Sequence, residues 1–182
     1  MTLQITLDLN DNDLKHFQLI MNQARSAAAR IAPEDIVAGA EKLMAEIGES
    51  DAPEFVQERL ASLRAMIDML SDIDWRLPDE EADRVYNALT YFAEPEDLIP
   101  DEIPGIGFLD DAIMIELVAR ELKYEIEAYQ DFCQFREQKR QTEHSGSASR
   151  DEWLQARREE LQSKMRHKRK HKTAALAKKL FG

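Results

Sequence analysis

The chain is poor in the residues that fix a fold covalently and in those that cross a membrane. Cys133 is the only cysteine among 182 residues, so an internal disulfide is excluded and we predict a reducing, cytoplasmic location. No apolar run of about 18 residues or more occurs, so we predict no transmembrane segment. The first residues, MTLQITLDLNDND, lack the basic start and apolar core of a signal peptide, which argues against secretion.

The chain also contains little of the alternating pattern that predicts a β-strand. Only Thr2–Leu9 alternates apolar and polar residues, and a lone strand leaves its backbone groups without partners. We therefore predict that residues 1–10 form an extended arm on the helices, or a strand that pairs with a second copy of the chain.

The remainder has the spacing of amphipathic helices, in which apolar residues recur three and four positions apart. Prolines followed by acidic residues mark helix starts at Pro33, Pro53 and Pro78. We predict an all-α fold, with a helical bundle of about five helices over residues 11–140. The predicted helices run over residues 13–31, 33–48, 53–75, 78–94 and from 108 to beyond 133.

Charge divides the chain into two parts. Residues 1–149 contain 13 Lys and Arg and 32 Asp and Glu, a net charge of −19, whereas residues 150–182 contain 11 and 4, a net charge of +7. Residues 141–149 (QTEHSGSAS) have no apolar anchor, which predicts a linker. We predict that residues 150–182 form a separate, exposed basic helix, because their apolar stripe is sparse.

An acidic connector lies between two of the predicted helices. Residues 94–111 contain seven carboxylates and no base, together with three of the six prolines and two of the six glycines. Turn residues next to apolar anchors predict an ordered connection.

A family resemblance rests on this connector. The residues that carry it are Asp97-Leu98-Ile99-Pro100-Asp101, Ile103-Pro104, Gly105, Gly107 and Leu109-Asp110-Asp111. Over residues 84–122 the chain resembles the YkvA-type family, small bacterial proteins with a domain of unknown function. The resemblance implies a helical module and no established activity. Family members usually have apolar flanking helices and look membrane-associated. The helices that flank the connector here include charged residues such as Arg84 and Glu121. We therefore rank peripheral membrane association below contact with a protein or nucleic acid.

The connector also offers candidate ligands for a divalent cation. Clustered carboxylates supply the hard oxygen ligands that Mg²⁺ and Ca²⁺ use, so a metal-dependent enzyme is a further alternative. We favour a structural interpretation, in which acids in a first helical turn cap amide groups and complement the helix dipole. The spacing matches no EF-hand loop, and no other cofactor is indicated. The candidate ligands are Asp97, Asp101, Asp110 and Asp111.

The end of the chain is the second candidate site. Residues 164–179 contain eight Lys and Arg, two His and no acid. Such runs bind phosphate backbones through counterion release, and they can also dock on acidic parts of their own chain. His167 and His171, four positions apart on a helix, could bind a metal weakly. The predicted anion or nucleic-acid contacts are Lys164, Arg166, Lys168, Arg169, Lys170, Lys172, Lys178 and Lys179.

Catalytic motifs are missing. No nucleophile is paired with a base, and no glycine-rich phosphate loop occurs, so we name no catalytic residue and lean away from an enzyme. We predict a YkvA-like interaction or regulatory protein. Its acidic body docks a protein partner or a second copy, and its basic tail contacts nucleic acid or the ribosome.

Overall fold

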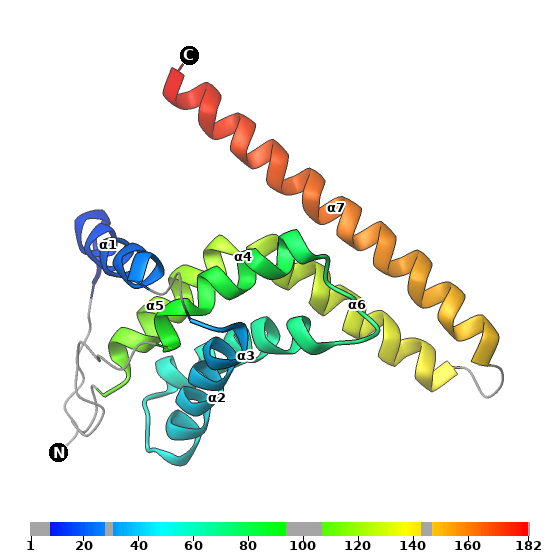
Figure 1. Ribbon diagram of the computed structural model, residues 1–182, viewed down its shortest axis with the longest axis horizontal. Coiled ribbons are helices and arrows are strands. Elements are labelled where there is room, and N and C mark those ends of the chain that lie inside the picture. The colour runs from blue at the N-terminus through cyan, green and yellow to red at the C-terminus, as the bar shows by residue number, and fades with distance from the viewer. Residues whose placement is uncertain (1–7, 28–30, 94–106, 143–146, 182) are drawn as a thin grey trace. The chain divides into compact units, whose positions relative to one another are not determined.

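The structure is a computed structural model that describes residues 8–27, 31–93, 107–142 and 147–181. Within these residues it contains seven α-helices, one 3-10 helix and no strand, which confirms the predicted all-α class (Figure 1). The predicted arm at residues 1–10 falls outside the described residues except for its last three positions, which are not helical. The elements are α1 Asp11–Ala27, α2 Pro33–Glu49, α3 Glu54–Ser71, α4 Asp79–Leu89, η1 Thr90–Ala93, α5 Leu109–Glu121, α6 Lys123–Thr142 and α7 Ser147–Phe181.

Local contacts explain where the first two helices begin. At α1, Oδ1 of Asn10 accepts the backbone N–H of Asp13 at 3.3 Å, while the Asp13 carboxylate accepts the N–H of Asn10 at 3.0 Å. This reciprocal pair is a capping-box arrangement. At α2, Pro33 occupies the first turn, where its missing N–H has no helical partner to lose. The predicted apolar stripe of α2 is confirmed by burial of Ile36, Ala40, Leu43 and Ile47.

The chain forms two compact units, each assembled from two separate stretches. Unit 1 comprises residues 1–59 and 86–118, and unit 2 comprises residues 60–85 and 119–182. These units cut across the predicted division into a helical domain and a separate C-terminal helix.

Unit 1 is closely packed where α2 meets η1. A Cβ atom added at Gly39 would lie 2.4 Å from the carbonyl oxygen of Phe92 and 2.8 Å from Cα of Ala93. Only glycine allows the two backbones to approach this closely. The core of this unit also buries Val56, Leu89, Phe108, Ala112, Met114, Ile115 and Val118.

Unit 2 is built around Trp75. Its fully buried ring lies 5.8 Å from the ring of Tyr129 and 5.1 Å from the ring of Phe132, measured between centroids. Both partners lie on α6, and such tilted aromatic pairs add to the free energy of simple burial. The same core includes Leu63, Met66, Met69 and Val85, with Leu154, Leu161 and Met165 from α7.

Two predicted helices end earlier than their apolar patterns indicate. The helix predicted to reach Trp75 ends at Ser71, because Oδ1 of Asp72 accepts the N–H groups of Asp74 and Trp75 and turns the chain. The long helix predicted from Phe108 is interrupted between α5 and α6 at Leu122. Because the interruption is one residue long, the apolar residues keep their three- and four-residue spacing across it. No proline or glycine marks the position.

The C-terminal helix differs most from expectation. We expected an exposed helix after a linker at 141–149, but α7 begins at Ser147 and packs antiparallel to α6 (Figure 1). The expectation of exposure is wrong for its first half, where Leu154, Leu161, Gln162 and Met165 are buried. The stripe is sparse because Arg158 and Gln162 occupy packed positions and donate hydrogen bonds to the carbonyls of Asp74 and Trp75 at 2.9 Å.

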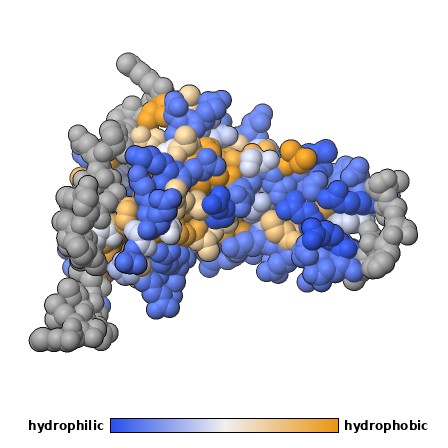
Figure 2. Space-filling view, turned by 90° about the horizontal axis from the view of Figure 1, so that it is seen from below, coloured by the Kyte–Doolittle hydropathy of each residue, from blue (hydrophilic) through white to orange (hydrophobic). Residues whose placement is uncertain are grey.

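The surface is predominantly polar. Figure 2 shows a face on which hydrophilic residues surround narrower apolar strips. Among the described residues, no helix has both the length and the apolar content that a membrane crossing requires.

Candidate anion-binding surface on the C-terminal helix

The middle of α7 is held to its own unit by a cluster of opposite charges. The Glu125 carboxylate on α6 accepts a hydrogen bond from Nη1 of Arg169 at 3.0 Å, and Nε of Arg84 on α4 lies 3.4 Å from the same carboxylate. Nη2 of Arg169 also lies 3.5 Å from Glu81, which Arg166 approaches to 3.7 Å. We call these five residues the buried clamp.

Burial of its two carboxylates makes the buried clamp necessary for the stability of the fold. The side chains of Glu81 and Glu125 are only 2% and 1% exposed. An ionised carboxylate at such a site is destabilising unless a positive charge compensates it. Arg166 and Arg169 are therefore committed to the fold and have limited freedom to bind an external anion.

Two further cations of the predicted binding run have acidic partners. Lys168 bonds Glu127 on α6 at 3.3 Å, and Lys164 bonds Glu160, one turn earlier on α7, at 2.8 Å. These pairs are exposed, so each stabilises the fold only weakly. The alternative in which the basic run docks on the chain's own acidic body thus applies to Arg166, Lys168 and Arg169, while Lys164 pairs within α7.

The last four predicted contacts differ. Within the described part of the chain, Lys170, Lys172, Lys178 and Lys179 form no ion pair, although Nζ of Lys172 lies 5.8 Å from the ring centroid of Tyr124. All four are exposed. The run of eight cations is therefore divided into a paired half, residues 164–169, and an unpaired half, residues 170–179.

A groove of about 610 Å³ accompanies the unpaired half. One wall comes from α7 and the other from Arg84, Glu121 and Tyr124. The α7 residues that line it are Arg169, Lys170, Lys172, Thr173, Ala174, Leu176 and Ala177. Aliphatic and aromatic groups thus form part of a groove whose charged residues are four cations and one acid.

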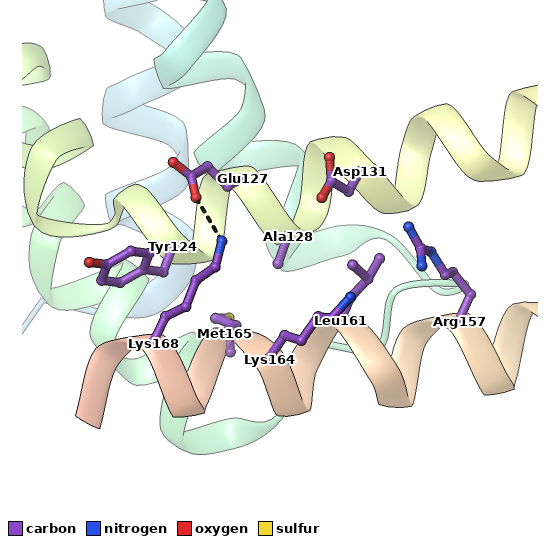
Figure 3. A pocket seen from close by; sticks show the side chains of 9 residues that line it. All are labelled: Tyr124, Glu127, Ala128, Asp131, Arg157, Leu161, Lys164, Met165 and Lys168. Carbon is purple, nitrogen blue, oxygen red and sulfur yellow. Dashed lines mark hydrogen bonds and ion pairs between the residues drawn. The ribbon is translucent and has the colours of Figure 1, made fainter. Parts of the chain in front are cut away.

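A smaller pocket of about 180 Å³ lies between α6 and α7 (Figure 3). Glu127 and Asp131 face Arg157, Lys164 and Lys168 across it, and a hydrogen bond joins Lys168 to Glu127. Charges of both signs line this small space, and the hydrogen bond from Lys168 to Glu127 joins its two walls. We assign it to helix packing.

The two histidines of the run contact each other. Nε2 of His167 and Nε2 of His171 are 3.0 Å apart, so one ring donates a hydrogen bond to the other. Both rings are exposed. Among the residues that the structure describes, no group of three or more His, Cys, Asp or Glu side chains is arranged for a metal ion.

The structure describes the acidic connector, residues 94–111, only from residue 107 onward. Asp97 and Asp101 lie outside the described residues, whereas Asp110 and Asp111 occupy the first turn of α5 and are 1% and 4% exposed. Their position matches the structural interpretation, since carboxylates near a helix N-terminus complement its dipole. Two of the four predicted metal ligands, Asp110 and Asp111, thus lie within the described residues.

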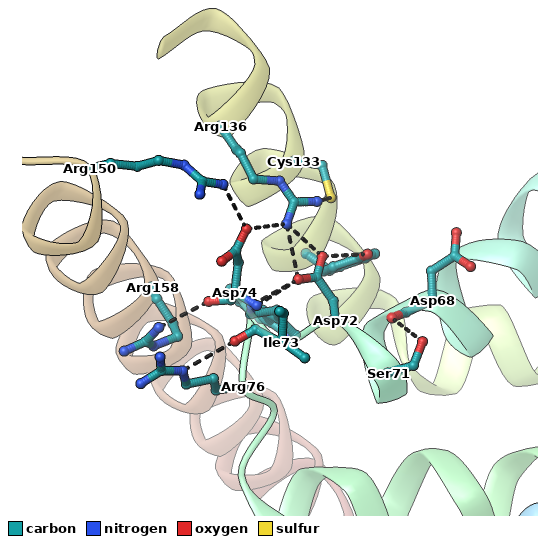
Figure 4. A network of polar contacts seen from close by, with 12 residues as sticks. Asp68, Ser71, Asp72, Ile73, Asp74, Arg76, Cys133, Arg136, Arg150 and Arg158 are labelled. Atoms are coloured by element: carbon teal, nitrogen blue, oxygen red, sulfur yellow. Dashed lines mark hydrogen bonds and ion pairs between the residues drawn. The ribbon is translucent and has the colours of Figure 1, made fainter. Parts of the chain in front are cut away.

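A polar network that the sequence did not suggest holds the turn between α3 and α4 (Figure 4). Asp72 accepts hydrogen bonds from the Tyr129 hydroxyl at 3.0 Å and from Arg136 at 2.9 Å. Asp74 is bonded by Arg136 at 3.2 Å and by Arg150 of α7 at 3.1 Å. The hydrogen-bonded side chains of each pair are 57 to 76 positions apart in the chain, so no local motif marks them.

This network shifts the protonation of its members. Burial alone would raise the pKa of Asp72, but the N–H of Trp75, the Tyr129 hydroxyl and the charge of Arg136 together hold it below its ordinary 3.8. Burial raises the pKa of Tyr129, and the neighbouring Cys133 and Asp72 raise it further. Burial likewise raises the pKa of the Cys133 thiol. A protonated thiol is a poor nucleophile, so the network fastens the turn and does not activate Cys133.

The family match lies almost entirely within unit 1. Residues 85–117 match the family described as "Protein of unknown function (DUF1232)". The chain is also 36% identical over 63 residues to the "Uncharacterized membrane protein YkvA" of Bacillus subtilis (strain 168), a match that covers 31% of this chain. The predicted YkvA-type resemblance is confirmed.

The match is partial on both sides. It spans 59% of the length of the B. subtilis protein. The DUF1232 match runs from the second half of α4 through η1 and the connector into α5, so the α7 surface lies outside it. No solved structure matches the chain.

Proposed function

We propose that this is a cytoplasmic, non-enzymatic interaction protein whose α7 presents a lysine-rich end to an external anionic polymer, nucleic acid or the ribosome. The observation that supports it is the division of the basic run. Residues 164–169 neutralise acids of unit 2, while Lys170, Lys172, Lys178 and Lys179 have no acidic partner among the described residues. The packed half of α7 holds the unpaired half in place.

The position of the unpaired half favours contact with something outside the fold. Lys172 lies beside Tyr124, close to where α6 begins, and α7 continues for nine more residues to Phe181. At a rise of 1.5 Å per residue this is about 14 Å of helix. Lysines attract phosphates without reading bases, so binding would tolerate many sequences.

A salt titration tests the proposal. Each phosphate neutralised on a single strand contributes about −0.7 to the slope of log K against log salt, or about −0.9 on a duplex. Four unpaired lysines therefore predict a slope of about −3, and all eight cations would give about −6. Anisotropy of a labelled single-stranded RNA measures it. No binding at low salt would contradict the proposal, and a slope near −6 would contradict the division of the run.

The acidic remainder of the chain docks a protein partner or a second copy in this proposal. Its net charge of −19 over residues 1–149 repels nucleic acid, so it would not compete with α7 for that ligand. Self-association through residues 1–9 is tested by light scattering of the full chain and of the chain without them. An unchanged mass would exclude the strand-pairing alternative.

A second candidate is contact with an anionic membrane surface. It is favoured by Leu176, which is 52% exposed between the unpaired lysines, and by the name of the B. subtilis relative. Lysines that flank an exposed apolar residue are typical of helices lying at a lipid interface. Flotation with phosphatidylglycerol vesicles, against phosphatidylcholine vesicles, separates this candidate from nucleic-acid binding.

A further inference from the structure

The groove beside α7 has a composition that neither a nucleic-acid backbone nor a flat bilayer requires. Its lining combines Tyr124, Leu176 and Ala177 with the cations Lys170 and Lys172. A phosphate backbone needs cations alone, and an apolar wall would be left facing water. An occupant with one anionic group and one apolar body satisfies both kinds of lining.

The cations of the groove differ in availability. Arg84 and Arg169 belong to the buried clamp and are held by Glu125 at 3.4 and 3.0 Å. Lys170 and Lys172 have no acidic partner in the described part of the chain, so they can receive an anionic head group. Glu121 is the one acid among the groove residues and leaves the lining positive overall.

Stacking of a nucleobase is disfavoured at the same place. The ring of Tyr124 lies 5.9 Å from Nζ of Lys168 and 5.8 Å from Nζ of Lys172, measured to the centroid. A base stacked on the ring would have to displace these two cations. An acyl chain needs only apolar contact with the ring and leaves the cation–π contacts in place.

We propose that the groove binds a single anionic amphiphile, a lipid whose acyl chain lies along Tyr124, Leu176 and Ala177 and whose head group pairs with Lys170 and Lys172. The inference rests on the second candidate function, contact of α7 with anionic lipid. It adds a defined site for one lipid molecule. A groove of about 610 Å³ is within the size range of sites that enclose small organic ligands.

The chain offers matched variants for the test. Ala177 lines the groove and Ala175 does not, although both are exposed on the same stretch of α7. Ala177→Trp would fill the groove, while Ala175→Trp adds the same bulk elsewhere. Likewise, Lys170 and Lys172 line the groove, whereas Lys178 and Lys179 do not.

The experiment is calorimetric titration of the full chain with monomeric dihexanoyl phosphatidylglycerol. Dihexanoyl phosphatidylcholine and glycerol 3-phosphate are the controls for charge and for acyl chain. We expect the chain to bind the anionic lipid and neither control compound. Ala177→Trp and K170Q/K172Q should each weaken this binding about tenfold or more. Ala175→Trp and K178Q/K179Q should change it by less than about twofold.

Four results would overturn the inference. Equal loss in Ala177→Trp and Ala175→Trp would show that the groove is not the site. Equal affinity for glycerol 3-phosphate would show that no acyl chain is recognised. No binding of the soluble lipid, while phosphatidylglycerol vesicles still bind, would remove the groove site and leave the membrane candidate intact. Failure of both soluble lipid and vesicles would remove the membrane candidate as well.

Discussion

Arg169 of α7 donates a hydrogen bond of 3.0 Å to the carboxylate of Glu125 on α6, a carboxylate that is almost inaccessible to water. The pair turns a basic helix that looked separate in the sequence into a structural part of unit 2. It also determines which cations remain for a partner. The predictions below follow from this relationship and from the packing around it.

Replacing Glu125 tests the buried clamp. Glu125→Gln removes the carboxylate that Arg84 contacts and one of the carboxylates that Arg169 contacts, so we expect the free energy of unfolding to fall by about 1.5 to 3 kcal/mol. Glu127→Gln is the matched control, since Glu127 is exposed and its pairs should contribute less than about 1 kcal/mol. Urea denaturation measures both. Equal effects would show that burial of Glu125 adds nothing to its pairing.

Two glycines of α2 should respond in opposite directions to alanine. Gly39→Ala places a Cβ 2.4 Å from the Phe92 carbonyl oxygen, and such overpacking should cost about 1 to 3 kcal/mol. At Gly48 a Cβ meets nothing within 4 Å, so Gly48→Ala should stabilise the helix by about 0.5 to 1 kcal/mol. Thermal unfolding of both variants measures the difference. A stable Gly39→Ala variant would contradict the close approach of α2 and η1.

The Asp72 network predicts a dependence on pH. The pKa of Asp72 is lowered in the folded protein, so its contribution to stability is present above its ordinary pKa of 3.8 and is lost as the pH falls through the folded value. The difference in unfolding free energy between the wild type and Asp72→Asn should therefore be largest near neutral pH and shrink below about pH 4. Asp131→Asn, an exposed control on α6, should show no such trend. A difference that stays constant into acid would contradict the assignment.

The acids at the start of α5 should act through the helix and not through a metal. Asp110→Asn should lower the free energy of unfolding by about 1 kcal/mol, because it weakens the dipole interaction of the first turn. The loss should be the same with and without Mg²⁺. Calorimetry with Mg²⁺, Ca²⁺ and Mn²⁺ provides the second check. Micromolar binding abolished by Asp101→Asn and Asp111→Asn would restore the metal-dependent alternative.

Local patterns in the sequence predicted the helices and most of the buried faces. The stripe Ile36, Ala40, Leu43 and Ile47 and the proline starts depend on neighbours within two turns, so they can be read from spacing alone. The break at Leu122 could not be, because the apolar period continues across it. The early end at Ser71 depends on one side chain, Asp72, whose turn-forming hydrogen bonds outweigh a favourable helical pattern.

The sequence predicted which cations make up the candidate site, but it did not predict which of them are paired with acids. The run of cations is visible in the sequence, and its acidic partners are not. Glu81 and Glu125 lie 88 and 44 positions from Arg169, and nothing near them in the sequence distinguishes them from the other acids. Only the packing of α7 against α4 and α6 shows that Arg166, Lys168 and Arg169 are paired with acids. Its packing on the turn after α3 explains why Arg158 and Gln162 occupy positions that looked solvent-facing.

The most direct test of the division of the basic run compares two double variants that each remove two positive charges. K178Q/K179Q removes unpaired lysines, and K164Q/K168Q removes lysines bonded to Glu160 and Glu127. Affinity for a labelled single-stranded RNA is measured by anisotropy at low salt, with phosphatidylglycerol vesicles as the parallel ligand. The account predicts that K178Q/K179Q weakens binding about tenfold or more while K164Q/K168Q changes it less than about twofold. Equal losses in the two variants would contradict it.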